Sequence, residues 1–277
     1  MLANIFFFLF THFTAGLLMT TLFISLQEIG RLFFRVTTLV GVFLLVFAIF
    51  SKPFGNVNFQ ILGDGSAADG NFWGQLTYLS FILSAVILLL YNIATPKMHK
   101  FLLSLATAAS LAGVASYALA GVPVAEPTTS EMVFPVMNGL AATFLLGSVL
   151  GTMITGHWYL VQHKLSLTPL KVTSMLFLSS VFFRILVLVI GLAAINKAGL
   201  QMAITDLLSG TSFNSWIFLI RVGFGLAVPL IFAFMIRSSV KIRSTQSATG
   251  ILYATIVLIL MGETFARYLS IAAGIPL

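Results

Sequence analysis

The sequence of 277 residues contains no cysteine. Disulfides, iron–sulfur clusters, thiolate zinc sites and thiol nucleophiles all need this side chain. The chain therefore supplies no cysteine-ligated redox centre and no thiol catalysis. It also contains no P-loop, no Gly-x-Ser-x-Gly, no His-Glu-x-x-His and no dinucleotide-binding fingerprint, which excludes the common motif-bearing hydrolases, kinases and dehydrogenases.

Charged residues are also scarce. They make up 8% of the chain, against 59% hydrophobic residues, and the mean hydropathy is +1.09. No soluble domain of this length could present that composition to water, so we predict an all-α integral membrane protein. The net charge of +7 comes from basic residues scattered between apolar segments, which is typical of topology signals, and we expect no nucleic-acid partner.

Eight apolar stretches come close to the ~20 residues that cross a bilayer. They are Ala3–Ser25, Leu32–Phe50, Trp73–Asn92, Phe101–Gly121, Phe134–Val161, Pro169–Ile195, Asn214–Ile236 and Thr245–Ala273. Because the first stretch lacks the basic flank of a signal peptide, we expect it to be retained as a helix. An even number of spans places both termini on one side of the membrane.

The loops indicate which side that is. The first, third, fifth and seventh connections carry the basic residues Arg31, Arg35, Lys97, Lys100, Lys164, Lys171, Arg237, Lys241 and Arg243. The other three connections carry only Lys52 and Lys197, together with five acidic residues. By the positive-inside rule both termini face outward, and we predict a multi-pass protein of the cell inner membrane with its termini on the periplasmic side.

The spans divide naturally into two bundles of four helices. We predict one bundle over residues 1–122, an outer linker over 123–133 and a second bundle over 134–277. The fifth span contains Gly147-x-x-x-Gly151, a spacing that lets another helix approach closely. We interpret this pair as a packing feature.

Polar residues within the spans are costly, by roughly 2.5–3.5 kcal/mol for one charge at the bilayer centre. Glu263 and Arg267 lie one helical turn apart in the last span, in the order that favours an i,i+4 ion pair. Arg184, Arg221 and His12 fall at the middle or in the outer half of their spans. These groups could form an ion-pair network that fixes helix register, or a polar pocket in which arginines hold a quinone headgroup and Glu263 exchanges its protons.

A haem b group ligated by two histidines needs both imidazoles at one depth. His12 and His157 differ in depth by something over ~10 Å on the rise of an α-helix. This pair fits haem poorly, so we do not expect a bound haem b.

The pattern of Gly262-Glu263-x-x-x-Arg267 in the eighth helix, Arg221 in the seventh, outward termini and no cysteine resembles the membrane anchor subunits of the polysulfide reductase and DMSO reductase type. The resemblance implies a subunit without its own redox centre that binds menaquinone or ubiquinone and docks an outward-facing iron–sulfur or cytochrome subunit of a respiratory electron-transport complex. It further implies that Glu263 exchanges protons and that Arg221 and Arg267 orient the quinone, with Arg184 and His12 as additional contacts.

Three other classes stay open on the sequence. They are a haem b membrane cytochrome, a transporter, and a structural assembly subunit of a membrane complex. Transporters often have broken helices at matching positions of two repeats. The one proline well inside a span, Pro229, has no such counterpart, which argues mildly against transport.

Overall fold

The computed structural model of the chain describes residues 2–52, 71–121, 129–162, 165–197, 205 and 207–272. These residues contain helices and no β-strand, as the composition predicts. Within them, eight helical segments are long and apolar enough to cross a membrane. Helices are expected there because hydrocarbon offers the backbone no hydrogen-bond partner, so each span must satisfy its own N–H and C=O groups.

The eight predicted spans agree with the structure, with small shifts at their ends. In chain order the segments are α1 (Leu2–Thr21), α2 (Leu26–Ile29), α3 (Arg31–Ser51), α4 (Asn71–Ile93), η2 (Pro96–Met98), α5 (His99–Leu119), α6 (Thr129–Val161), α7 (Thr168–Lys197), α9 (Phe213–Val222), η3 (Gly223–Ala227), α10 (Val228–Lys241) and α11 (Thr245–Ala272). The segments α9, η3 and α10 together form the seventh span.

The first span was predicted to reach Ser25 but ends at Thr21. The short helix α2 follows, and Gly30, with φ of 88°, separates it from α3. A residue with a side chain rarely adopts that positive φ, whereas glycine does so without steric cost.

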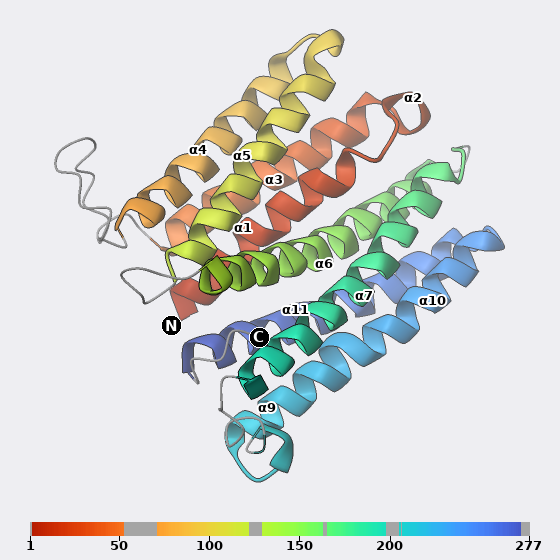
Figure 1. The fold of residues 1–277 in the computed structure, drawn as a ribbon. Helices are drawn as coiled ribbons and strands as arrows, with labels where there is room; N and C mark the ends of the chain where they lie inside the picture. Colours follow the sequence, from red (N-terminus) through yellow and green to blue (C-terminus); the bar gives the residue numbers. More distant parts are fainter. Residues whose placement is uncertain are drawn as a thin grey trace.

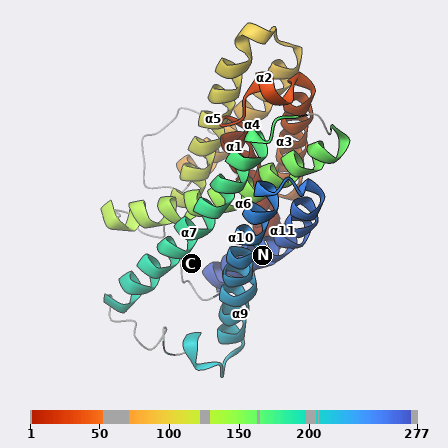
Figure 2. The ribbon, with the colours of Figure 1, turned by 90° about the vertical axis from the view of Figure 1, so that its right-hand side faces the viewer.

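The helices lie in two groups (Figure 1). One contains α3, α4 and α5, and the other contains α7, α10 and α11, while α1 and α6 lie between them. Seen from the side, α6 is inclined to the helices on both sides of it (Figure 2). Side chains of α1 contribute to both hydrophobic cores, so the helix that begins the chain joins the two groups. The predicted division into two bundles stays a prediction, and most of the predicted linker, residues 123–128 of 123–133, falls outside the described residues.

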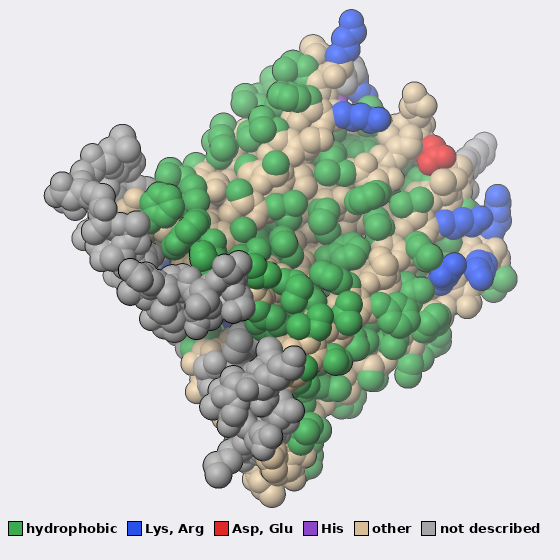
Figure 3. All heavy atoms as spheres, viewed as in Figure 1, with side chains coloured by type: hydrophobic (Ala, Val, Ile, Leu, Met, Phe, Trp, Pro, Cys, Tyr) green, Lys and Arg blue, Asp and Glu red, His purple; other side chains and the backbone are tan. Residues whose placement is uncertain are grey.

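A broad hydrophobic surface covers the middle of the molecule, and Lys and Arg side chains gather at one end (Figure 3). Among the described residues many large apolar side chains are exposed, including Phe43 at 62%, Phe50 at 80% and Ile93 at 84%. Such a surface is stable in hydrocarbon and unfavourable in water. The architecture is therefore that of a multi-pass membrane protein, while the orientation in the inner membrane stays a prediction.

The helices α1 and α6 meet at Gly16 and Gly147, where their backbones touch. A Cβ atom on Gly147 would overlap the backbone of Gly16, and one on Gly151 would lie 2.9 Å from a methyl carbon of Thr20. The interpretation of Gly147 and Gly151 as a packing feature is confirmed. Their partner is α1, so this contact holds the two helix groups together.

We expect Gly147→Ala to destabilise the protein by about 3 kcal/mol, because the added methyl group must push two helix backbones apart. The matched control is Gly250→Ala in α11, where nothing lies within 4 Å of the new Cβ. That control should lose no stability and should gain up to about 1 kcal/mol, because alanine favours a helix more than glycine does. Thermal unfolding of the two purified variants in detergent compares them, and equal effects would contradict this role of Gly147.

Candidate functional site

A buried ion pair joins α7 to α11. Arg184 donates from Nε to Oε1 of Glu263 at 2.8 Å and from Nη2 to Oε2 at 2.7 Å. The two side chains are 1% and 3% exposed. Two parallel bonds of this kind match the planar guanidinium to the planar carboxylate, which is the strongest geometry available to such a pair.

The predicted i,i+4 ion pair between Glu263 and Arg267 is wrong. Both oxygens of Glu263 accept from Arg184, and Arg267 extends instead to Tyr117 on α5. The i,i+4 rule describes neighbours on an exposed helix surface. Within the bundle, an arginine on a facing helix can meet the carboxylate with both of its donor groups, and that bidentate contact replaces the local one.

Asn138 on α6 completes this arrangement, because its Oδ1 accepts a hydrogen bond from Nη1 of Arg184. Asn138 was not predicted as a site residue from the sequence. It is the only residue with a carboxamide side chain in the fifth apolar stretch, and this could have indicated a polar contact inside the bundle. A lone carboxamide in a bilayer needs a polar partner, and here the partner is a buried cation.

Arg221 on α9 lies beside this pair. It is 1% exposed and interacts electrostatically with both Arg184 and Glu263. Among the described residues, none of its three guanidinium nitrogens has a hydrogen-bond partner. The structure therefore brings Arg184, Arg221 and Glu263 together, as two buried cations around one carboxylate. We name these three residues with Asn138 the ion-pair cluster.

A π-helical turn begins two residues after Arg221 and packs on α11. In this turn, Gly223–Ala227, a Cβ on Gly225 would lie 2.6 Å from Cα of Gly262, the residue before Glu263. In an α-helix the N–H of residue 229 would bond the carbonyl of Gly225, but Pro229 has no N–H. The backbone hydrogen bonds can therefore shift from the α-helical to the wider π-helical spacing. The close approach of the two glycines fixes Arg221 next to Glu263.

Arg267 lies one helical turn farther along α11 and faces the first helix group. Its Nη2 donates to the hydroxyl of Tyr117 at 2.7 Å. Its guanidinium carbon lies 5.4 Å from the ring centre of Phe8 and 5.1 Å from that of Tyr117, within range of cation–π attraction. Arg267 thus connects α11 to α1 and α5.

His12 on α1 packs against the two aromatic rings that also contact Arg267. Its ring is 4.0 Å from that of Phe8 and 6.0 Å from that of Tyr117, and Nδ1 is 3.2 Å from Oγ1 of Thr11. The side chain is 1% exposed, and it interacts electrostatically with Arg267 and, more weakly, with Arg184. His12 is therefore buried among aromatic rings and lies within electrostatic range of both Arg267 and Arg184.

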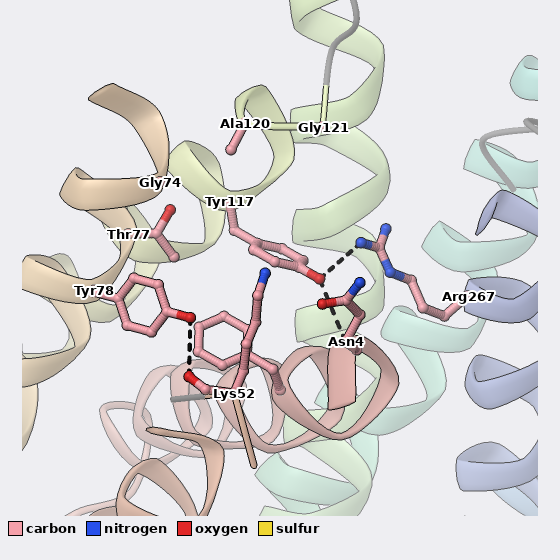
Figure 4. A pocket seen from close by; sticks show the side chains of 10 residues that line it. Asn4, Lys52, Gly74, Thr77, Tyr78, Tyr117, Ala120, Gly121 and Arg267 are labelled. Carbon is pink, nitrogen blue, oxygen red and sulfur yellow. Dashed lines mark hydrogen bonds between the residues drawn. The ribbon is translucent and has the colours of Figure 1, made fainter. Parts of the chain in front are cut away.

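A cavity of about 140 Å³ opens beside Arg267, between α1, the end of α3, α4, α5 and α11 (Figure 4). Its lining residues are Asn4, Phe7, Lys52, Gly74, Thr77, Tyr78, Tyr117, Ala120, Gly121 and Arg267. Among the residues that the structure describes, none of those lining it is acidic. We name it the Arg267 cavity.

The groups lining the Arg267 cavity combine aromatic rings with hydrogen-bond donors. The Tyr78 hydroxyl donates to the backbone oxygen of Lys52 at 3.1 Å, and the Tyr117 hydroxyl lies 3.5 Å from the backbone oxygen of Asn4. The Lys52 ammonium lies 5.7 Å from the ring centre of Phe7. Two cations and several hydroxyl groups around aromatic walls suit a flat ligand that carries oxygen acceptors.

Lys52 is half-buried at the end of α3. Burial and, to a lesser extent, the positive charge of Arg267 lower the pKa of its ammonium group below the usual value. The sequence predicted Lys52 only as a loop residue. Its position at the end of an apolar stretch could have indicated that it lies at the end of a membrane-spanning helix.

Loss of either partner of the Arg184–Glu263 pair should be strongly destabilising. We expect Glu263→Met or Arg184→Met to cost about 3–5 kcal/mol, because each leaves a buried charge without its partner. The double variant Arg184→Met, Glu263→Met removes both charges of the pair but leaves Arg221 buried, so its loss should be smaller than the sum of the two single losses. Thermal unfolding in detergent measures all three proteins. Additive losses in the double variant would contradict a direct interaction.

The sequence matches no protein-family model, and no curated protein is significantly similar to it. The resemblance to polysulfide reductase and DMSO reductase anchors therefore stays a prediction. Any functional assignment depends on the membrane architecture and on the chemistry of the ion-pair cluster and the Arg267 cavity.

Proposed function

We propose that this chain is a quinone-interacting membrane anchor subunit of a respiratory oxidoreductase complex, and that the quinone headgroup binds in the Arg267 cavity. The observation that carries the proposal is the cavity itself, in which Arg267 and Lys52 face an aromatic-lined space at one end of the helix bundle. A transmembrane protein that binds a lipid-soluble redox carrier needs such a site within reach of the bilayer.

The recognition chemistry follows from the lining groups. A quinone is a flat ring with two carbonyl oxygens, and these oxygens accept hydrogen bonds from cationic or hydroxyl donors. Arg267 and Tyr117 would hold one oxygen, and Lys52 would hold the other. The rings of Phe7 and Tyr78 would pack against the quinone ring. The isoprenoid tail would lie along the exposed apolar surface of the neighbouring helices.

The ion-pair cluster has a supporting role in this proposal. It fixes α11 against α7 and α9, and the same helix presents Arg267 to the cavity one turn away. The sequence-based roles of Glu263 in proton exchange and of Arg184, Arg221 and His12 as quinone contacts stay predictions. Since Glu263 accepts both of its hydrogen bonds from Arg184, the geometry favours Arg267 over Glu263 as the group nearest the quinone.

The expected partners follow from the same proposal. Electrons would pass between the bound menaquinone or ubiquinone and an iron–sulfur or cytochrome subunit docked on the outer side of the inner membrane. The cavity lies at the end of the bundle opposite the basic turns, such as the one that carries Lys241 and Arg243. By the positive-inside rule, we expect this end to face the outer side of the membrane.

The proposal predicts saturable binding of a fluorescent quinol analogue, such as an alkyl-hydroxyquinoline N-oxide, to the purified chain. Arg267→Gln should weaken binding at least about tenfold, the equivalent of one charge-assisted hydrogen bond. The matched control Arg237→Gln removes the same charge from α10 and should leave binding unchanged. Fluorescence quench titration in detergent measures the dissociation constants.

Two results would contradict the proposal. One is an absence of saturable binding to the wild-type chain. The other is an equal loss in the Arg267 and Arg237 variants, which would indicate non-specific attraction of the analogue. An absorption spectrum of the same sample tests the haem alternative, because a Soret band would identify the chain as a haem protein.

A further inference from the structure

Quinone reduction consumes protons as well as electrons. Two electrons and two protons convert a quinone to a quinol, with one proton added to each oxygen, and oxidation releases them. The electrons come from the docked iron–sulfur or cytochrome subunit of the proposed function. The protons must pass through a group that touches a quinone oxygen and regains its proton from water.

Most groups around the Arg267 cavity do not meet this requirement. Arginine side chains do not exchange their protons in this way in proteins, so Arg267 does not qualify. Asn4 and Thr77 do not titrate. The hydroxyls of Tyr78 and Tyr117 are directed toward backbone oxygens of Lys52 and Asn4, and a phenol has an ordinary pKa of about 10.

Glu263 and His12 do not meet it either. Neither is among the residues that line the cavity. Glu263 accepts both of its hydrogen bonds from Arg184. His12 is buried against the rings of Phe8 and Tyr117, with Thr11 as the partner of its Nδ1.

Lys52 meets the requirement. It lines the cavity opposite Arg267, and its side chain projects among the rings and hydroxyls of the other lining residues (Figure 4). It is also partly exposed at the end of α3, directly after the last residue of that span. The ammonium group can therefore contact a ligand in the cavity and exchange with water outside it.

The charges around Lys52 also favour release of its proton. The charged or titratable groups that face it are Arg267 from α11, Tyr78 from α4 and Tyr117 from α5, while α1 contributes Asn4 and Phe7. Among these described residues no carboxylate holds the ammonium in its charged form. Burial and Arg267 both lower the pKa of Lys52, which is the direction in which a lysine becomes a proton donor and acceptor near neutral pH.

We infer that Lys52 is the residue that exchanges a proton with the quinone headgroup. This inference rests on the proposed quinone site. In the reducing direction the Nζ–H bond breaks as the O–H bond of the quinol forms, and the neutral amine then takes a proton from water. In the oxidising direction the amine accepts the quinol proton and releases it to water.

The first test uses two ligands of nearly the same shape, 2-hydroxy-1,4-naphthoquinone, which is an anion at neutral and alkaline pH, and neutral 2-methyl-1,4-naphthoquinone. Below the pKa of Lys52 the ammonium attracts the anion, and above it the attraction is lost. The wild-type chain should therefore bind the anion about tenfold more weakly as the pH rises from neutral through that pKa. Binding of the neutral ligand should not change.

Three variants assign this effect to Lys52. Lys52→Arg keeps its charge at every pH, so anion binding should stay strong and independent of pH. Lys52→Gln should bind the anion weakly throughout. Lys241→Gln removes a lysine ammonium from α10, outside the cavity, and should keep the wild-type profile.

The second test follows the proton directly. A mediated redox titration of the bound methyl-naphthoquinone should show a change of slope in the plot of potential against pH at the pKa of Lys52, and Lys52→Arg should lack it. A wild-type profile without pH dependence, or a Lys52→Arg profile identical to it, would overturn the inference. Failure of both naphthoquinones to bind the wild-type chain would instead overturn the proposed function.

Discussion

The cost of placing charge in hydrocarbon governs this structure. Three charged side chains, Arg184, Arg221 and Glu263, are almost completely buried, and the bidentate bond between Arg184 and Glu263 offsets part of their desolvation. The pairing joins α7 to α11. It fixes how far the two helices are shifted along their axes relative to each other, and which faces they turn toward each other. Arg267 shares α11 with Glu263, so the position of the cavity-lining guanidinium depends on an ion pair one turn away.

The contact between α1 and α6, which connects the two helix groups, tolerates little change. Direct backbone contact between Gly16 and Gly147 leaves no room for a side chain between α1 and α6. The same α1 supplies Phe8, which packs against Arg267 and His12, and Phe7, which lines the cavity near Lys52. The cavity therefore lies where α1, α5 and α11 meet, and its shape depends on contacts from both groups of helices.

The sequence predicted the eight spans well, because a bilayer forces long apolar runs that composition alone reveals. It also identified Arg184, Arg221 and Glu263 as polar residues that must avoid lipid, and the structure brings all three together. It paired Glu263 with Arg267 incorrectly, since spacing along one helix carries no information about which arginine a facing helix supplies. The sequence did not identify Lys52, Tyr117 or Asn138 as site residues. The position of each in the sequence does not show which helices lie beside it, and only those neighbours reveal its role.

The separation of the two polar groups has a functional consequence. In the ion-pair cluster, the carboxylate is bound by one arginine and surrounded by protein, so exchange of its proton with water would first require the pair to open. In the Arg267 cavity, a permanent guanidinium charge lies close to a partly exposed ammonium whose pKa it helps to lower. A fixed cation can hold a ligand oxygen while a titratable neighbour moves its proton. In the proposed site Arg267 and Lys52 would divide these two tasks, so α11 would stay in place during proton exchange and the buried pair between Arg184 and Glu263 would stay closed.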